Sequence, residues 1–114
     1  MSYFHNKRVW VTGASSGIGR DVAIKLSKLG AELILTARSR DKLEEVKKEC
    51  GNAKTHIFEH DLSNLDSIDD LVSKVANQVG TIDILFNNAG ISAYSSANET
   101  NFTVYEQVMK LNFL

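Results

Sequence analysis

The chain has 114 residues, a length typical of one domain, and its 43% apolar and 24% charged residues are ordinary for a globular protein. Its formal net charge of −1 argues against a dedicated nucleic-acid or membrane-surface binder. No apolar run reaches the roughly 18 residues of a transmembrane helix, and the start of the chain lacks a signal peptide's apolar segment. We therefore expect no membrane segment in this chain and, by default, a cytoplasmic location.

Short aliphatic or β-branched runs alternate along the chain with amphipathic stretches. The runs predict strands at 7–12, 32–36, 55–60 and 82–86. Apolar residues at helical spacing predict helices over 18–29, 41–49, 63–79 and from 103 onward, and a glycine follows each of the first three. In the first helix we expect one buried face made of Ile18, Val22, Ala23, Leu26 and Leu29. Capping is expected from Asp41 with Glu44 in the second helix, from Ser63 in the third and from Thr103 with Glu106 in the last.

Strands that alternate with helices predict right-handed crossovers and a parallel sheet with helices on both faces. We expect the α/β class, with a Rossmann-type doubly wound sheet and the strand order 3-2-1-4. The apolar helical pattern at 111–114 stops without a cap, and the fourth strand would be left at the edge of the sheet. We therefore expect residues 1–114 to be the N-terminal cofactor-binding part of a single Rossmann domain that is incomplete at its C-terminus.

The clearest local motif is the glycine turn Thr-Gly-Ala-Ser-Ser-Gly-Ile-Gly at 12–19, which follows a predicted strand and opens a predicted helix. Gly13 permits a tight turn, Gly17 lets the backbone approach a pyrophosphate, and Gly19 allows close packing of helix on sheet. The free amides of the first helical turn then face the phosphates, and Ser15 and Ser16 add hydroxyl donors. A glycine-rich turn without any ligand is the alternative. The motif lacks the Lys-Ser/Thr ending of a triphosphate-binding loop.

With this motif, the sequence resembles the short-chain dehydrogenase/reductase family. Further matches follow in the family's order: Asp61-Leu62 after the third strand, Asn87-Asn88-Ala89-Gly90 after the fourth, and Asn112 on the last helix. The sequence looks most similar to the dehydrogenase/reductase member 7 branch, through Val-Trp-Val-Thr-Gly-Ala-Ser-Ser-Gly-Ile-Gly and Leu-Ile-Leu-Thr-Ala-Arg. The resemblance implies an oxidoreductase that transfers hydride between a nicotinamide cofactor and a carbonyl or alcohol.

The resemblance also implies residue roles. Asp61 would accept a hydrogen bond from the adenine amino group and Leu62 would offer its backbone beside the ring. Asn87 would tie neighbouring strands together, and Asn112 would match the family's catalytic asparagine, which holds a water in a proton relay. The cofactor-binding residues would be Gly13, Ser15, Ser16, Gly17, Ile18, Gly19, Arg38, Asp61, Leu62, Asn88, Ala89 and Gly90.

The end of the second strand predicts which nicotinamide cofactor is preferred. NAD enzymes of this fold use Asp or Glu there to bind the ribose 2′-hydroxyl, but this chain has Ala37 followed by Arg38. An arginine can grip a 2′-phosphate through paired, charged hydrogen bonds. We therefore predict NADP(H) over NAD(H). The alternative is that Arg38 and Arg40 form a solvated face that pairs with Glu44 or Glu45.

The family's catalytic serine and Tyr-x-x-x-Lys are expected to lie outside this chain, since neither Tyr94 nor Tyr105 is followed by lysine four positions later. A catalytically inactive, truncated dinucleotide-binding or interaction module is therefore the alternative to the enzyme. A methyltransferase of related topology is disfavoured because it would want an acid at the end of the second strand. Partners would be a small carbonyl or alcohol substrate and, by resemblance, a second copy of the full-length form. No metal is expected, because the histidines lack ligand spacing with Cys50.

Overall fold

The computed structural model describes residues 3–61 and 67–88 of the chain. Strands and helices alternate there as the sequence predicts. The elements are β1 (Arg8–Thr12), α1 (Gly17–Lys28), β2 (Glu32–Ala37), α2 (Arg40–Glu49), β3 (Thr55–Glu59), α3 (Ile68–Gln78) and β4 (Ile84–Asn87). The helix expected from Thr103 onward, with Glu106 in its cap, lies outside the described residues.

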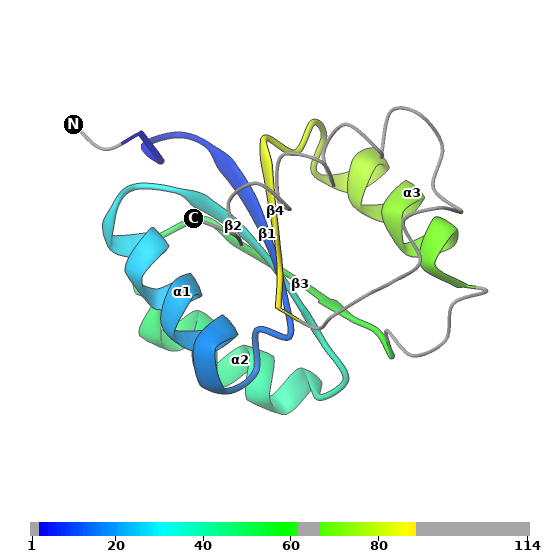
Figure 1. Ribbon diagram of the computed structural model, residues 1–114, viewed down its shortest axis with the longest axis horizontal. Coiled ribbons are helices and arrows are strands. Elements are labelled where there is room, and N and C mark those ends of the chain that lie inside the picture. Colours follow the sequence, from blue (N-terminus) through cyan, green and yellow to red (C-terminus); the bar gives the residue numbers. More distant parts are fainter. Residues whose placement is uncertain (1–2, 62–66, 89–114) are drawn as a thin grey trace.

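The four strands form one parallel sheet in the order β3-β2-β1-β4, which confirms the predicted doubly wound topology. Helices α1 and α2 lie on one side of this sheet and α3 lies on the other (Figure 1). Because the strands are parallel, all four end at the same edge of the sheet. The described residues that directly follow the four strands, among them Gly13, Arg38, His60 and Asn88, therefore lie at this one edge, where ligands bind in this architecture.

The core consists of the two central strands and the helix faces that cover them. In β1 and β2 nearly every side chain is buried, as expected for parallel strands that are covered on both faces. The helices contribute small and branched aliphatic side chains at helical spacing. The fully buried apolar residues, at or below 1% exposure, are Val9, Val11, Ala14, Ala23, Leu33, Ile34, Leu35, Leu43, Val46, Val75 and Leu85. No helix that the structure describes is long and apolar enough to cross a membrane.

The expected buried face of α1 was wrong at its two ends. Ala23 and Leu26 are buried as predicted, but Ile18 is 66% exposed and Leu29 is 42% exposed. The face that meets the sheet is centred on Gly19, Ala23 and Leu26, and both exposed residues lie at its margin. The exposure of Ile18 leaves an apolar side chain in solvent beside the glycine turn.

Two predicted helix starts differ from the structure. In α2 the capping residue is Ser39, whose hydroxyl accepts a hydrogen bond from the Lys42 amide at 3.3 Å, so Asp41 lies inside the first turn. There the negative charge of Asp41 interacts favourably with the positive end of the helix dipole. Helix α3 begins at Ile68, later than expected, with Ser67 before it and two aspartates in its first turn. Ser63 lies outside the described residues.

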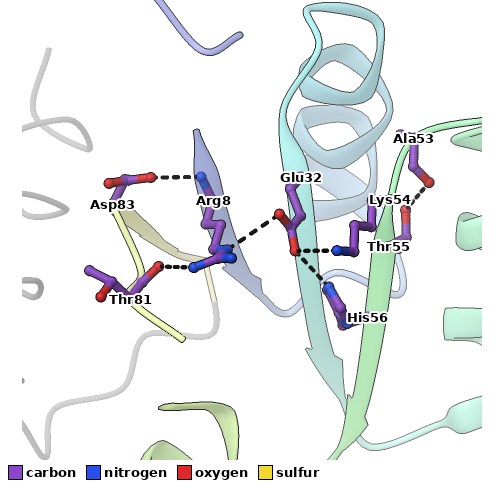
Figure 2. Close-up of polar contacts among 8 residues, drawn as sticks. All are labelled: Arg8, Glu32, Ala53, Lys54, Thr55, His56, Thr81 and Asp83. Carbon is purple, nitrogen blue, oxygen red and sulfur yellow. Dashed lines mark hydrogen bonds and ion pairs between the residues drawn. The ribbon is translucent and has the colours of Figure 1, made fainter. Parts of the chain in front are cut away.

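A network of charged groups crosses the opposite edge of the sheet, where the strands begin (Figure 2). The Glu32 carboxylate on β2 accepts hydrogen bonds from Arg8 Nε on β1 at 3.3 Å and pairs with His56 Nε2 on β3 at 2.8 Å. Lys54 Nζ lies 4.0 Å from the same carboxylate. The Arg8 amide also donates to Asp83 at 2.9 Å. Glu32 therefore links three strands far from the edge that carries the glycine turn.

This network predicts a pH dependence of stability. Burial alone would raise the pKa of Glu32, but hydrogen bonds from His56 and Arg8, with the charges of Arg8 and Lys54, outweigh it and lower that pKa. The stabilisation is therefore complete above the unfolded-state pKa of about 4.3 and is lost as the pH falls through the folded-state pKa. We expect Glu32→Gln to lower the free energy of unfolding at pH 7 by about 1–2 kcal/mol and to have a smaller effect at pH 3.

Denaturant unfolding at pH 7 and at pH 3 measures this difference. Glu59→Gln is the matched control, because Glu59 is an exposed carboxylate on β3. Its free energy of unfolding should stay within about 0.5 kcal/mol of the wild-type value at both pH values. A Glu32→Gln effect of the same size at pH 7 and pH 3 would show that charge is not its cause.

Candidate functional site

The predicted site residues that the structure describes gather at the edge of the sheet where the strands end. The glycine turn joins β1 to α1, Arg38 follows β2 directly, Asp61 follows β3, and Asn88 follows β4. Backbone and side-chain hydrogen bonds connect these segments to one another, as described below. Leu62, Ala89, Gly90 and Asn112 lie outside the described residues.

The glycine turn has the backbone geometry that only glycine adopts at low cost. Gly13 has φ 64° and Gly17 has φ 60°, both in the left-handed region. A Cβ placed on Gly17 would meet no atom of residues 3–61 and 67–88 within 4 Å. Gly17 therefore faces open space, so the backbone here can be approached closely by a ligand.

Gly19 is required for a different reason from the one expected. A Cβ on this residue would lie 2.2 Å from the carbonyl oxygen of Gly13 and 3.0 Å from Nδ2 of Asn88. The crowding atom is therefore the backbone of the same turn, whereas the sequence suggested close packing of the helix on the sheet. Gly19 lets the first turn of α1 close onto the strand-to-helix connection.

The N-terminus of α1 has free amide donors. Ser16 precedes the helix in extended conformation, and its side chain makes no capping hydrogen bond. The first amides of an α-helix have no partner inside the helix, and the helix dipole places partial positive charge on them. Ser16 and Ile18 are exposed beside them. This arrangement suits an anion such as a phosphate.

The asparagines after and within β4 hold the turn in place. Asn88 Nδ2 donates to the Gly13 carbonyl at 3.4 Å, which ties the end of β4 to the glycine turn. The Thr12 hydroxyl donates to Asn87 Oδ1 at 2.8 Å, and both side chains are buried. Asn87 thus bridges β1 and β4, in agreement with the predicted role of tying strands together.

The two arginines at the end of β2 have different surroundings. Arg40, in the first turn of α2, lies 4.0 Å from Glu44 in an exposed pair. Arg38 is exposed, and no carboxylate of the described residues lies within ion-pair distance of it. The solvated pairing considered from the sequence therefore holds for Arg40 only. The guanidinium of Arg38 remains available to a ligand at this edge.

His60 and Cys50 are held in structural contacts. The His60 amide donates to the Ala37 carbonyl at 2.9 Å, and its Nε2 lies 2.9 Å from the Ser67 hydroxyl. It therefore closes the end of β3. Burial raises the pKa of the Cys50 thiol, which makes it a poor nucleophile at neutral pH. Within residues 3–61 and 67–88, no three His, Cys, Asp or Glu side chains are placed to hold a metal ion.

One tyrosine that the sequence reasoning passed over has lysine four positions later. Lys7 Nζ lies over the Tyr3 ring, 5.3 Å from its centre. This pair precedes β1, whereas the glycine turn follows it, so a strand of five residues separates the two by about 17 Å. The Tyr3 and Lys7 side chains therefore belong to the opposite edge of the sheet, and the spacing carries no catalytic meaning there.

The sequence of this chain is similar to those of known proteins. The mouse protein named dehydrogenase/reductase SDR family member 7 is 44% identical over 112 residues, which are 93% of this chain and 33% of that protein. The human protein of the same name gives the same figures. The chain thus spans about a third of the length of these curated relatives.

Solved structures superpose on the same fold. A metagenomic short-chain oxidoreductase in complex with NADP is 30% identical, with a TM-score of 0.73 over 96% of this chain and 56% of that one. A short chain dehydrogenase/reductase from Burkholderia phymatum in complex with NAD is 28% identical, with a TM-score of 0.67 over 75% of this chain and 31% of that one. The profile of the short chain dehydrogenase family matches residues 7–114. With the parallel sheet and the glycine turn in place, this match establishes that the chain belongs to the short-chain dehydrogenase/reductase family of oxidoreductases.

Proposed function

We propose that this chain forms the adenosine and pyrophosphate half of an NADP(H) site in an oxidoreductase that interconverts carbonyls and alcohols. The observation that carries the proposal is the uncapped N-terminus of α1, which begins at a glycine turn whose Gly17 faces open space. Two oxidoreductases of this fold were solved with NADP and with NAD. Their ligands support a nicotinamide dinucleotide here.

The described residues fit the parts of such a cofactor. The amides that follow Ser16 would bind the pyrophosphate, with the hydroxyls of Ser15 and Ser16 as further donors. Asp61, which follows β3, would accept a hydrogen bond from the adenine amino group. Asn88 would lie on the adenosine ribose side, beside the turn that it already contacts. When bound, the nicotinamide supplies or accepts the hydride.

The preference for NADP(H) rests on the end of β2. The position where NAD enzymes of this fold have an acidic residue for the ribose 2′-hydroxyl is occupied here by the buried Ala37. The exposed Arg38 follows it. A 2′-phosphate here would meet a guanidinium that has no competing carboxylate among the described residues. Arg38 therefore has the charge and exposure that a 2′-phosphate requires.

Proton transfer to the substrate requires groups beyond those described. The resemblance assigns it to a serine and a Tyr-x-x-x-Lys pair at the cofactor, and Tyr3 with Lys7 lies at the opposite edge of the sheet. Asn112 is proposed to hold a water in the same relay. We expect a polypeptide of residues 1–114 to bind NADPH without reducing a carbonyl. The intact mass of the protein in its source cells then decides whether the catalytic segment is present.

Substituting the arginine at the end of β2 tests the cofactor preference. We expect Arg38→Ala to weaken NADPH binding roughly ten- to hundredfold, because charged hydrogen bonds of about 1.5–3 kcal/mol are lost. NADH, which lacks the 2′-phosphate, should bind with unchanged affinity. Calorimetric titration of both cofactors measures the two dissociation constants.

Arg40→Ala is the matched control, since it removes the neighbouring arginine that is already paired with Glu44. Its NADPH affinity should stay within about twofold of the wild-type value, because exposed ion pairs contribute little. Equal NADPH affinity in wild type and Arg38→Ala would remove Arg38 from the site. A wild-type protein that binds neither cofactor would overturn the proposed function as a whole.

A further inference from the structure

A buried side-chain hydrogen bond lies inside the sheet, below the proposed cofactor site. Trp10 Nε1 on β1 donates to the Thr36 hydroxyl on β2 at 2.8 Å. Trp10 is 5% exposed and Thr36 is fully buried. An indole N–H in this position needs a partner, because a buried donor without one costs more free energy than the bond itself contributes.

This contact runs diagonally towards the end of the strands. Trp10 lies opposite Ile34 in the strand register, and Thr36 lies two residues further along β2, opposite Thr12. The indole therefore reaches from the middle of β1 to Thr36, the second-last residue of β2. It connects the core of the sheet to the edge where the cofactor would bind.

The end of β2 is in turn hydrogen-bonded to two of the cofactor loops. The Thr36 carbonyl accepts the amide of Ala14, in the glycine turn, at 3.2 Å. The next carbonyl, that of Ala37, accepts the amide of His60 at 2.9 Å, immediately before Asp61. Arg38 then leaves the strand and is exposed. Thus the carbonyls of Thr36 and Ala37 hold the glycine turn and the segment before Asp61. The next residue, Arg38, is the candidate ligand of the 2′-phosphate.

We propose that Trp10 and Thr36 are positioning residues for the dinucleotide: their hydrogen bond fixes the end of β2, and through it the glycine turn and Arg38. The inference rests on the proposed function. Thr36 is the only side chain in this junction, among those described, that accepts from the indole. Without the Thr36 hydroxyl, the buried indole N–H has lost its acceptor. We expect the Trp10 ring to move towards another acceptor and the end of β2 to move with it.

The test compares Thr36→Val, which keeps the shape and removes the acceptor, with Thr36→Ser, which keeps the hydroxyl. NADPH and NADH are titrated into the full chain at a temperature where each variant is folded by circular dichroism. We expect Thr36→Val to weaken NADPH binding about tenfold and to reduce the preference for NADPH over NADH. Thr36→Ser should restore both to within about twofold of the wild-type values.

A control separates positioning from lost stability. Val46→Ala removes buried side-chain volume in the second half of α2, away from the helix start that follows Arg38, and lowers stability. It should leave both dissociation constants unchanged while the protein remains folded. Should Thr36→Val not fold, Trp10→Phe removes the donor while keeping an aromatic ring, and the same expectations apply.

Amide hydrogen exchange without cofactor gives a second readout. We expect the Ala14 amide to exchange about tenfold faster in Thr36→Val than in wild type, and at the wild-type rate in Thr36→Ser. Unchanged exchange and unchanged cofactor preference in a folded Thr36→Val protein would overturn this inference alone. If the wild-type protein binds neither cofactor, the proposed function fails and the role in dinucleotide binding fails with it. Exchange at Ala14 then still shows whether Thr36 holds the turn.

Discussion

Replacing Gly19 with alanine is expected to lower the free energy of unfolding by about 1–3 kcal/mol. Helix propensity alone predicts the opposite sign, since alanine is better than glycine inside a helix by about 1 kcal/mol. The structure decides against propensity because the added Cβ would lie 2.2 Å from the Gly13 carbonyl oxygen. That oxygen is backbone, so relief requires the turn to open. We also expect NADPH affinity to fall at least about tenfold, because the turn that would bind the pyrophosphate moves.

Thermal or denaturant unfolding measures the stability and calorimetric titration measures the binding. Asp21→Ala is the control, because Asp21 lies exposed in the same helix. This substitution should change the free energy of unfolding by no more than about 0.5 kcal/mol. A Gly19→Ala protein that is more stable than wild type would mean that the first turn of α1 does not close onto Gly13.

A second large effect is expected from a pair of matched glycine substitutions. Gly17 has φ 60° and Gly51 has φ 63°, and a Cβ on either would meet no atom within 4 Å in the part of the chain that the structure describes. Alanine at either position therefore carries the same cost of a left-handed backbone, about 1–2 kcal/mol of stability. Gly51 follows α2 at the edge where the strands begin, so it is remote from the proposed cofactor site.

The two variants should differ in cofactor binding. In Gly17→Ala the new methyl group occupies the open space where the pyrophosphate would approach the backbone, so we expect NADPH affinity to fall roughly thirty- to hundredfold. Gly51→Ala should bind NADPH as the wild type does. Because both lose the same stability, the difference isolates ligand contact from folding. Equal NADPH affinities in the two variants would place the pyrophosphate elsewhere.

Local patterns in the sequence were sufficient for the topology. Alternating strand and helix signals predicted the strand order, and Gly30 and Gly51 end α1 and α2 with positive φ, as their positions indicated. The glycine turn was recognisable because its residues are contiguous. Arg38 and the missing acid at Ala37 were also visible, since they needed only the end of one strand to be located.

Other features depend on atoms that are distant in the sequence. Whether Ile18 is buried depends on how α1 is rotated about its axis against the sheet. The apolar spacing of the helix fixes that rotation only to within part of a turn. Ser39 was missed as the cap of α2 because Asp41 and Glu44 offered a competing signal within two residues. Tyr3 and Lys7 have catalytic spacing, but only the course of β1 shows that they lie at the wrong edge.

The sequence by itself determined the family, the order of the elements and the residue types that meet at the ends of the strands. Only the tertiary structure decided what holds those ends together: the Gly13 carbonyl against Gly19, and the Trp10 indole on the Thr36 hydroxyl. The physical reason is range. Propensity, periodicity and turn chemistry act over a few neighbouring residues, whereas a contact between two strands or across a turn exists only after the sheet has fixed the distance between its atoms.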